Sequence, residues 1–167
     1  MAGPDPFDQL WDEHHQRVLA YALRRTDRAS AQDVVSDVFL VAWRRRDELP
    51  RDPLPWLLGT ARHVLANHAR SRRRNDALRQ LLLDQARQSR GEPADVSLLT
   101  ALAQLDPHDR EVLLLSGWDG LSAAQAGESL GCSAATFRVK LLRARRRLRA
   151  QLGDAHVPLT SPEGAAS

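Results

Sequence analysis

The stretch that most constrains the fold is SAATFRVKLLRARRRLRAQL, which occupies residues 133–152. It contains seven arginine and lysine residues and no acid. Its apolar residues recur at steps of three and four, and these are Phe137, Leu141, Ala144, Leu148 and Leu152. This spacing places them along one side of an α-helix. The stretch is therefore predicted to be a helix that packs by one face and carries positive charge on the rest of its surface.

Positive charge is concentrated in two segments of the chain. Seven of the 24 lysine and arginine residues lie in residues 132–152 and six more lie in residues 51–74, although the net charge of all 167 residues is only +3. A local concentration of one charge usually binds a polyanion. The two segments are therefore candidates for binding a nucleic acid or an anionic membrane surface.

The apolar periodicity predicts an all-α fold. Helices are expected at about residues 8–25, 30–46, 55–74, 96–105, 107–116, 122–130 and 133–152. Ser30 is expected to cap the second helix. Trp11 and Trp43 are expected on the apolar faces of the first and second helices. Prolines between residues 50 and 55 separate the second helix from the third, because proline cannot sit inside a helix.

The helices divide into two small helical domains. We expect the first domain at residues 1–74 and the second at residues 97–152. The residues between them, 75–96, are expected to be a flexible linker. The composition of residues 153–167 predicts a disordered tail. Each domain ends in one of the two basic helices.

The segment that precedes and opens the last helix has the features of a helix-turn-helix motif without a wing. Ser122 and Ser133 are placed to cap two successive helices. Gly131 between them permits the positive φ that the tight turn requires. Gly127 keeps the first helix small where the second lies against it. In such a motif the second helix enters the major groove of DNA.

The outer face of the last helix combines cations with aliphatic groups. Guanidinium groups hydrogen-bond guanine or phosphate, and aliphatic groups contact the methyl group of thymine. The residues predicted to contact DNA are Thr136, Arg138, Val139, Lys140, Leu142, Arg143 and Arg146. Arg145, Arg147 and Arg149 are expected to contact phosphates. A solvated basic face and a helix that lies on a membrane surface are the alternatives. The serine caps and the glycine turn favour DNA.

The other basic helix, within PWLLGTARHVLANHARSRRR, carries a partly exposed strip formed by Arg62, His63, Asn67 and Arg70. Asparagine and histidine can hydrogen-bond base edges, and arginine neutralises phosphates. These four residues are therefore candidates for a second contact with DNA. A role as ordinary surface residues is an equally good interpretation for His63 and Asn67.

The preceding helix carries Asp33 and Asp37 on one face. A solvated face is one interpretation of this pair. The other is a surface that docks a protein, with charged residues such as Arg44 at its rim.

Several motifs that would indicate other functions are absent. Cys132 is the only cysteine, which excludes an intramolecular disulfide and a cysteine-rich zinc site. The first residues do not have the pattern of a signal peptide, and the longest apolar run, residues 38–43, is too short to span a bilayer. No P-loop, Gly-x-Ser-x-Gly or His-Glu-x-x-His motif is present. We therefore expect a cytoplasmic protein with no metal, no cofactor and no enzymatic activity.

Three motifs, in this order, resemble those of the extracytoplasmic-function sigma factors, a group of the sigma-70 family of bacterial RNA polymerase subunits. SAQDVVSDVFLVAWRR resembles the polymerase-docking helix of region 2. PWLLGTARHVLANHARSRRR resembles the helix of region 2 that recognises and melts the upstream edge of the minus-ten element. LAQLDPHDREVLLLSGWDGLSAAQAGESLGCSAATFRVKLLRARRRL resembles region 4, whose last helix reads the minus-thirty-five element. The resemblance covers about residues 7–74 and 97–151.

The resemblance implies a function in transcription initiation. Proteins of this family bind core RNA polymerase, recognise both promoter elements and help to melt the DNA. The resemblance also implies that Asp33, Asp37, Phe39 and Arg44 dock on the clamp coiled coil of the polymerase, and that region 4 docks on its flap tip. An anti-sigma factor is a further expected partner, and insertion into a membrane is not expected.

The residues by themselves leave a second function open, a self-sufficient helix-turn-helix repressor or activator. In such a protein the first domain would sense a ligand or form a dimer. The basic segment ARHVLANHARSRRR argues against this function, because a sensing domain has no use for it.

Overall fold

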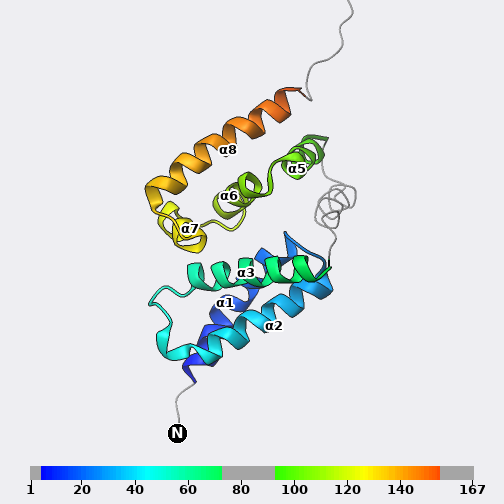
Figure 1. Ribbon diagram of the computed structural model, residues 1–167. Coiled ribbons are helices and arrows are strands. Elements are labelled where there is room, and N and C mark those ends of the chain that lie inside the picture. Colours follow the sequence, from blue (N-terminus) through cyan, green and yellow to red (C-terminus); the bar gives the residue numbers. More distant parts are fainter. Residues whose placement is uncertain (1–4, 73–92, 155–167) are drawn as a thin grey trace, which may run out of the picture.

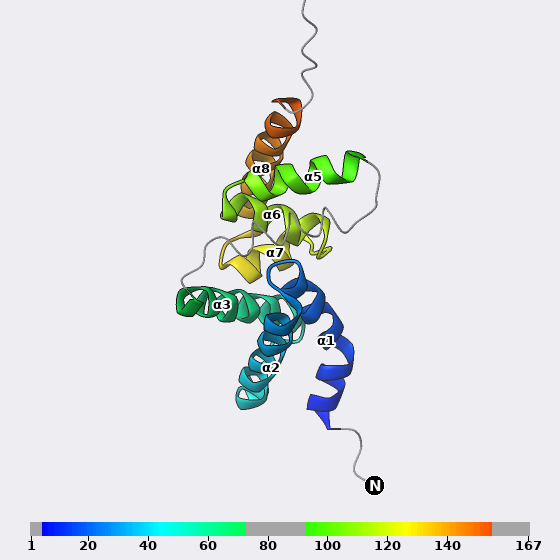
Figure 2. The same ribbon diagram turned by 90° about the vertical axis from the view of Figure 1, so that its right-hand side faces the viewer.

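Every regular element in the described part of the chain is a helix, so the predicted all-α fold is confirmed. The computed structural model describes residues 5–72 and 93–154. The predicted linker and tail fall outside these ranges, apart from residues 93–96 and 153–154, which belong to helices. The helices of the N-terminal half form one layer, and those of the C-terminal half form a second layer beside it (Figures 1 and 2).

The two layers correspond to the two predicted groups of helices. The first module consists of α1 (Pro6–Leu23), α2 (Arg28–Arg44), the short 3-10 turn η1 (Arg46–Glu48) and α3 (Leu54–Arg72). The second module consists of α5 (Pro93–Gln104), α6 (Pro107–Gly117), α7 (Ala123–Leu130) and α8 (Ala134–Asp154). Each module ends in a basic helix, as the sequence predicts.

The first two helices each begin at an aspartate. Asp5 accepts a hydrogen bond from the backbone amide of Phe7 at 3.0 Å. Asp27 accepts hydrogen bonds from the amide and the hydroxyl of Ser30, at 2.9 and 2.7 Å. The prediction that Ser30 caps α2 is wrong, because the aspartate three residues earlier satisfies the free amides of the first turn with a charged acceptor.

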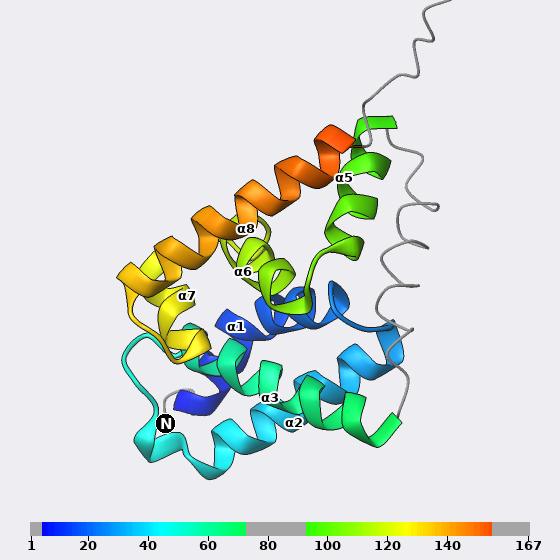
Figure 3. The same cartoon turned by 45° about the horizontal axis from the view of Figure 1, so that its top comes forward.

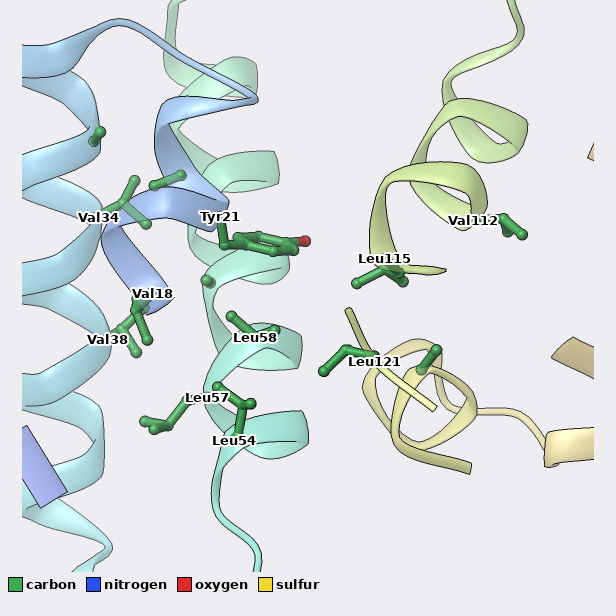
Figure 4. Packing of buried hydrophobic residues seen from close by; sticks show 14 of the residues in the cluster. Val18, Tyr21, Val34, Val38, Leu54, Leu57, Leu58, Val112, Leu115 and Leu121 are labelled. Atoms are coloured by element: carbon green, nitrogen blue, oxygen red, sulfur yellow. The ribbon is translucent and has the colours of Figure 1, made fainter. Parts of the chain in front are cut away.

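The first module packs its three helices around a core of aliphatic side chains, Tyr21 and Phe39, much of which Figure 4 shows. The largest contributors are Val18, Tyr21, Val34, Val38, Leu54, Leu57 and Leu58. Each of these side chains is at most 3% exposed. Burial of apolar surface on this scale is what holds three helices of modest length together.

Trp11 and Trp43, both expected on apolar faces, lie at the rim of the first module with 37% and 42% of their surface exposed. Trp43 packs edge-on against Phe7, with ring centroids 4.9 Å apart. Trp11 packs edge-on against Phe39, with centroids 4.7 Å apart. Each indole therefore covers the core with one part of its ring system and presents the remainder to solvent.

The second module contains a buried arginine that the sequence does not reveal. Arg110 in α6 is 7% exposed, and its guanidinium donates hydrogen bonds to the carbonyl groups of Leu102 at 2.9 Å and of Ala103 and Leu105 at 3.0 Å. These carbonyls belong to the end of α5, where a helix has acceptors without an internal partner. The positive charge also suits the negative end of the helix dipole. Arg110 therefore fixes the angle between α5 and α6.

The two modules pack directly on each other, which the sequence does not predict. Helix α3 of the first module lies against α7 of the second (Figures 1 and 3). Leu58 on α3 faces Leu115 and Leu121 of the second module (Figure 4), and all three are at most 5% exposed. The apolar cores of the two modules therefore form one continuous cluster.

Candidate nucleic-acid interface

Helices α7 and α8 form the predicted helix-turn-helix. The hydroxyl of Ser122 accepts a hydrogen bond from the amide of Gln125 at 3.2 Å, and the side chain of Gln125 accepts one from the amide of Ser122 at 3.1 Å. This reciprocal pair is a capping box. Gly131 ends α7 with a φ of +71°, in the left-handed region that favours glycine. The predicted cap at Ser122 and turn at Gly131 are confirmed.

Gly127 is the point where α7 and the turn approach each other most closely. A Cβ atom on this residue would lie 2.7 Å from the carbonyl oxygen of Cys132 and 3.1 Å from the carbonyl carbon of Ser133. Phe137, at the start of α8, is fully buried with 0% exposure. The predicted requirement for a residue without a side chain at this position is confirmed. The close approach fixes the direction in which α8 leaves the turn.

Ser133 caps α8, as predicted. Its hydroxyl accepts a hydrogen bond from the amide of Thr136 at 3.1 Å, and the hydroxyls of Ser133 and Thr136 are hydrogen-bonded to each other at 2.9 Å. Thr136, one of the predicted DNA contacts, is exposed but its hydroxyl takes part in this cap. Thr136 therefore takes part in the first turn of α8.

The outer face of α8 combines exposed aliphatic and cationic side chains. Val139 and Leu142 are 48% and 53% exposed, which is unusual for side chains of this kind. Arg138, Arg143 and Arg146 are exposed and Lys140 is half-buried. Within the described residues no acid forms an ion pair with any of these four cations. The face is thus positively charged and partly apolar, and its cations have no acidic partner among the residues that the structure describes.

One cation of α8 is already used inside the second module. Arg147 forms an ion pair with Asp109 of α6, whose side chain is 7% exposed. A buried carboxylate needs such a partner, because removal from water is costly for an isolated charge. Arg147, which was expected to contact phosphates, therefore helps to fasten α8 to α6. Arg145 and Arg149 are exposed.

The predicted strip on α3 is divided by the packing of the two modules. His63, Asn67 and Arg70 are exposed, whereas Arg62 is only partly exposed. The Nε atom of Arg62 is buried and has no hydrogen-bond partner within the described part of the protein. Three of the four residues are therefore open to solvent, and the fourth is partly buried.

The predicted docking face on α2 is largely accessible. Asp33 and Arg44 are exposed, and Asp37 forms an ion pair with His68 of α3 at 3.1 Å. Phe39 is 3% exposed and packs in the core against the rings of α1. Phe39 is therefore placed beneath this face and not on it. Leu40, which is 47% exposed, lies between the charged residues and was not recognised from the sequence.

None of the helices in the described residues is both long and apolar enough to cross a membrane. Residues 5–72 and 93–154 also contain no cluster of three or more histidine, cysteine, aspartate or glutamate side chains arranged to hold a metal ion.

Family models match both modules. The model described as Sigma-70 region 2 matches residues 10–75, and the model described as Sigma-70, region 4 matches residues 95–148. The first match spans nearly all of α1 to α3. The second spans α5 to α7 and most of α8, including the exposed face that carries Val139 and Leu142.

The chain is similar to several sigma factors, both in sequence and in structure. The ECF RNA polymerase sigma factor SigC of Mycobacterium tuberculosis is 35% identical over 143 residues, which are 80% of this chain and 76% of SigC. The ECF RNA polymerase sigma factor SigL of the same species is 33% identical over 157 residues, 87% of this chain and 88% of SigL. The structure of CnrH in complex with the cytosolic domain of CnrY is 28% identical, with a TM-score of 0.66, and the likeness covers 90% of this chain and 89% of CnrH.

Proposed function

Because this chain belongs to the extracytoplasmic-function sigma factors of the sigma-70 family, we propose that its two modules bind the two elements of a promoter. The family directs RNA polymerase to promoters and thereby starts transcription. We assign residues 1–74 to region 2, which binds core polymerase and the minus-ten element, and residues 97–152 to region 4, which binds the minus-thirty-five element. The observation that carries this proposal is the exposed cationic and aliphatic face of α8.

In this proposal α8 enters the major groove through its first turns. Val139 and Leu142 contact thymine methyl groups there, and Arg138 and Arg143 hydrogen-bond the edges of bases. Arg146, with Arg145 and Arg149 toward the end of the helix, contacts phosphates and sets the register. The packing of Phe137 and Gly127 beneath the helix supplies the rigid base that such readout needs.

The substitution Arg143→Ala tests whether this residue reads a base. If Arg143 hydrogen-bonds a guanine through two nitrogen atoms, its loss should reduce discrimination between the correct and the altered element by about 1–3 kcal/mol. The measurement is a fluorescence-anisotropy titration of the protein, bound to core polymerase, with the promoter and with a promoter altered at one base pair. Arg149→Ala is the matched control, since it removes the same charge from the far end of the helix. If Arg143→Ala lowers the affinity for both DNA sequences equally, Arg143 contacts a phosphate and does not read a base.

Helix α3 provides the proposed contact with the minus-ten element. His63 and Asn67 offer groups that can hydrogen-bond unpaired bases, and Arg70 offers a charge for the backbone. Their common exposure on one helix supports this assignment. Arg62 completes the strip when its guanidinium is accessible.

The α2 face is the proposed docking surface for the polymerase clamp. The face carries the exposed Asp33, Leu40 and Arg44 and the partly exposed Asp37, so an apolar group lies among charges of both signs. Such a mixture is typical of an interface between proteins. Phe39 supports the face from the core and is not expected to touch the partner.

Reversing the charges of Asp33 and Asp37 should weaken the binding of core polymerase. The double substitution Asp33→Arg and Asp37→Arg places two positive charges where the partner meets negative ones, and at least a tenfold loss of affinity, about 1.4 kcal/mol, is expected. The matched control is Asp8→Arg with Asp12→Arg, which makes the same change in net charge on α1. Unfolding curves show whether either variant is destabilised. If the two double variants bind core polymerase with equal affinity, Asp33 and Asp37 do not belong to the docking surface.

The remaining assignments follow from the family and concern the cellular setting. We propose that the protein acts in the cytoplasm, has no enzymatic activity of its own and binds core polymerase through its clamp and flap tip. We also propose that an anti-sigma protein controls it. CnrH, which is 28% identical in sequence to this chain over the matched part, was solved with the cytosolic domain of CnrY.

A further inference from the structure

Of the two acids on the docking face of α2, only one is held by another side chain. Asp37 accepts a hydrogen bond through Oδ2 from Nε2 of His68 on α3, and the two atoms are 3.1 Å apart. Asp33, one turn earlier on the same face, has no hydrogen-bonded or ion-paired partner among the residues that the structure describes. The two carboxylates therefore differ in their freedom to move, although they have the same spacing pattern in the sequence.

His68 reaches Asp37 because it lies near the packed side of α3. Val64 and Leu65, which precede it by four and three residues, are partly buried against the core. Residues at these spacings share one side of a helix. Asn67, the next residue back along the chain, is exposed. The imidazole therefore lies at the border between the packed and the open side of α3, and its side chain is 32% exposed.

This hydrogen bond does not depend on the charge of the imidazole. An ionised carboxylate only accepts hydrogen bonds, so Nε2 must carry a proton. A neutral imidazole meets this condition in one of its two tautomers, and a protonated imidazole always meets it. His68 can therefore hold Asp37 in both of its protonation states, and the contact fixes an orientation independently of charge.

The contact leaves part of Asp37 available to a partner. Its side chain is 50% exposed, and the second carboxylate oxygen, Oδ1, accepts no hydrogen bond within the described ranges. Leu40 and Arg44 follow Asp37 by three and seven residues, so they share its side of α2, and both are exposed. Oδ1 is therefore an acceptor without a partner beside the apolar and the cationic member of the docking face.

A carboxylate that is already oriented binds a cationic partner with a smaller loss of conformational freedom than a mobile one. Ordering one side chain at an interface lowers the affinity by about two- to tenfold. An ion pair between half-exposed groups, in contrast, contributes little to the stability of a fold. The effect of the contact between His68 and Asp37 is therefore expected in binding and not in folding.

We propose that His68 is a positioning residue of the polymerase-docking face. It holds Asp37 in one side-chain orientation, so that Oδ1 is presented to a basic group of the polymerase. This role rests on the proposed function of the α2 face, because it concerns the docking that takes place there. A residue of the helix assigned to the minus-ten element thereby serves the surface that binds polymerase.

Three substitutions and one control separate this role from other effects. His68→Ala removes the donor, and Asp37→Ala removes the acceptor. His68→Gln supplies an amide nitrogen that can donate the same hydrogen bond without a titratable group. The matched control is His108→Ala, which removes an exposed histidine at the start of α6. There Asp106 accepts its hydrogen bond from the backbone amide of His108, so the substitution leaves that bond in place.

The first measurement is the orientation of the Asp37 side chain in the full chain without polymerase. Three-bond NMR couplings from the carboxyl carbon to the backbone nitrogen and carbonyl carbon report the populations of the χ1 rotamers. We expect one dominant rotamer in the parent, in His68→Gln and in His108→Ala, and averaged couplings in His68→Ala. Asp33 is the internal reference and should give averaged couplings throughout. A single Asp37 rotamer in His68→Ala, or averaged couplings in the parent, would overturn the proposal.

The second measurement is the affinity of core polymerase, obtained by titration against the full chain labelled at its amino terminus. His68→Ala should weaken binding about two- to tenfold, and His68→Gln and His108→Ala should bind as the parent does. In the Asp37→Ala background, His68→Ala should have no further effect, because the residue through which it acts is gone. Equal losses in the two backgrounds, or a loss that glutamine does not restore, would show that His68 does not act through Asp37.

The remaining outcomes separate this proposal from the proposed function. If Asp37→Ala weakens binding and His68→Ala does not, the docking face is correct and the positioning role is wrong. If the parent binds polymerase and Asp37→Ala binds equally well, Asp37 is not part of the docking face, and the positioning role fails with that assignment. If the parent does not bind polymerase, the proposed function fails, and the role of His68 in docking fails with it.

Discussion

Replacing Phe137 with alanine is expected to lower the free energy of unfolding by about 3–5 kcal/mol. The phenyl ring is 0% exposed and belongs to the buried apolar cluster beneath the helix-turn-helix. Alanine would leave a cavity there, because α7 and α8 are held apart by their own backbone contacts and cannot close it. Urea denaturation followed by circular dichroism gives the change directly. Binding of the minus-thirty-five element should be lost with the structure of the motif.

Leu142→Ala is the control for this substitution. Leu142 is also a large apolar side chain of α8, but it is 53% exposed on the opposite face. Its loss should change stability by no more than about 0.5 kcal/mol, and should reduce binding of DNA that contains thymine at the contacted position. If Phe137→Ala and Leu142→Ala destabilised the protein equally, the assignment of an inner and an outer face to α8 would be wrong.

The second large effect is expected for Gly127→Ala, which should destabilise the protein by about 3 kcal/mol. The added methyl group would lie 2.7 Å from the carbonyl oxygen of Cys132. This oxygen belongs to the backbone of the turn, so it can move only if the turn or α8 moves with it. The better helix propensity of alanine offsets the effect by about 1 kcal/mol at most.

Thermal unfolding and DNA binding together test this prediction. Gly117→Ala makes the same change at the open end of α6 and should leave the melting temperature unchanged or slightly higher. Even the molecules of Gly127→Ala that remain folded should bind the minus-thirty-five element less well, because α8 leaves the turn at a different angle. A variant with the stability and affinity of the parent would show that the close approach at Gly127 is not needed.

Local rules predicted the helix-turn-helix well. Ser122 and Ser133 are caps, and Gly131 adopts a positive φ, because each depends on neighbours within a few residues. The same rules assigned the cap of α2 to Ser30, since serine is a common cap. The charged Asp27 occupies that position and binds Ser30 itself.

Contacts between distant residues could not be predicted in this way. Arg147 was expected to bind phosphate, and its pairing with Asp109, 38 residues away, leaves no pattern in the sequence. Arg25 donates hydrogen bonds to Glu111 and Asp119, which are more than 80 residues away. Periodicity identifies the faces of a helix that pack, but it does not identify which helix each face meets. The docking of one module on the other is therefore the main feature that sequence reasoning missed.

The candidate site was predicted in part. The exposure of Val139 and Leu142 agrees with the helical pattern, because both lie opposite the buried side of α8. Phe39 was assigned to the docking face of α2, but its side chain points into the core. The exposed Leu40 beside it was not identified as part of this face.

The most direct test of the account is promoter-directed transcription by core RNA polymerase with the purified full-length chain. A library of genomic DNA fragments from the source bacterium serves as template, and the 5′ ends of the transcripts are mapped. The account predicts defined start points that appear only with the protein, share two upstream sequence elements and weaken with Arg143→Ala. Identical transcripts with and without the protein, although it binds the polymerase, would contradict it.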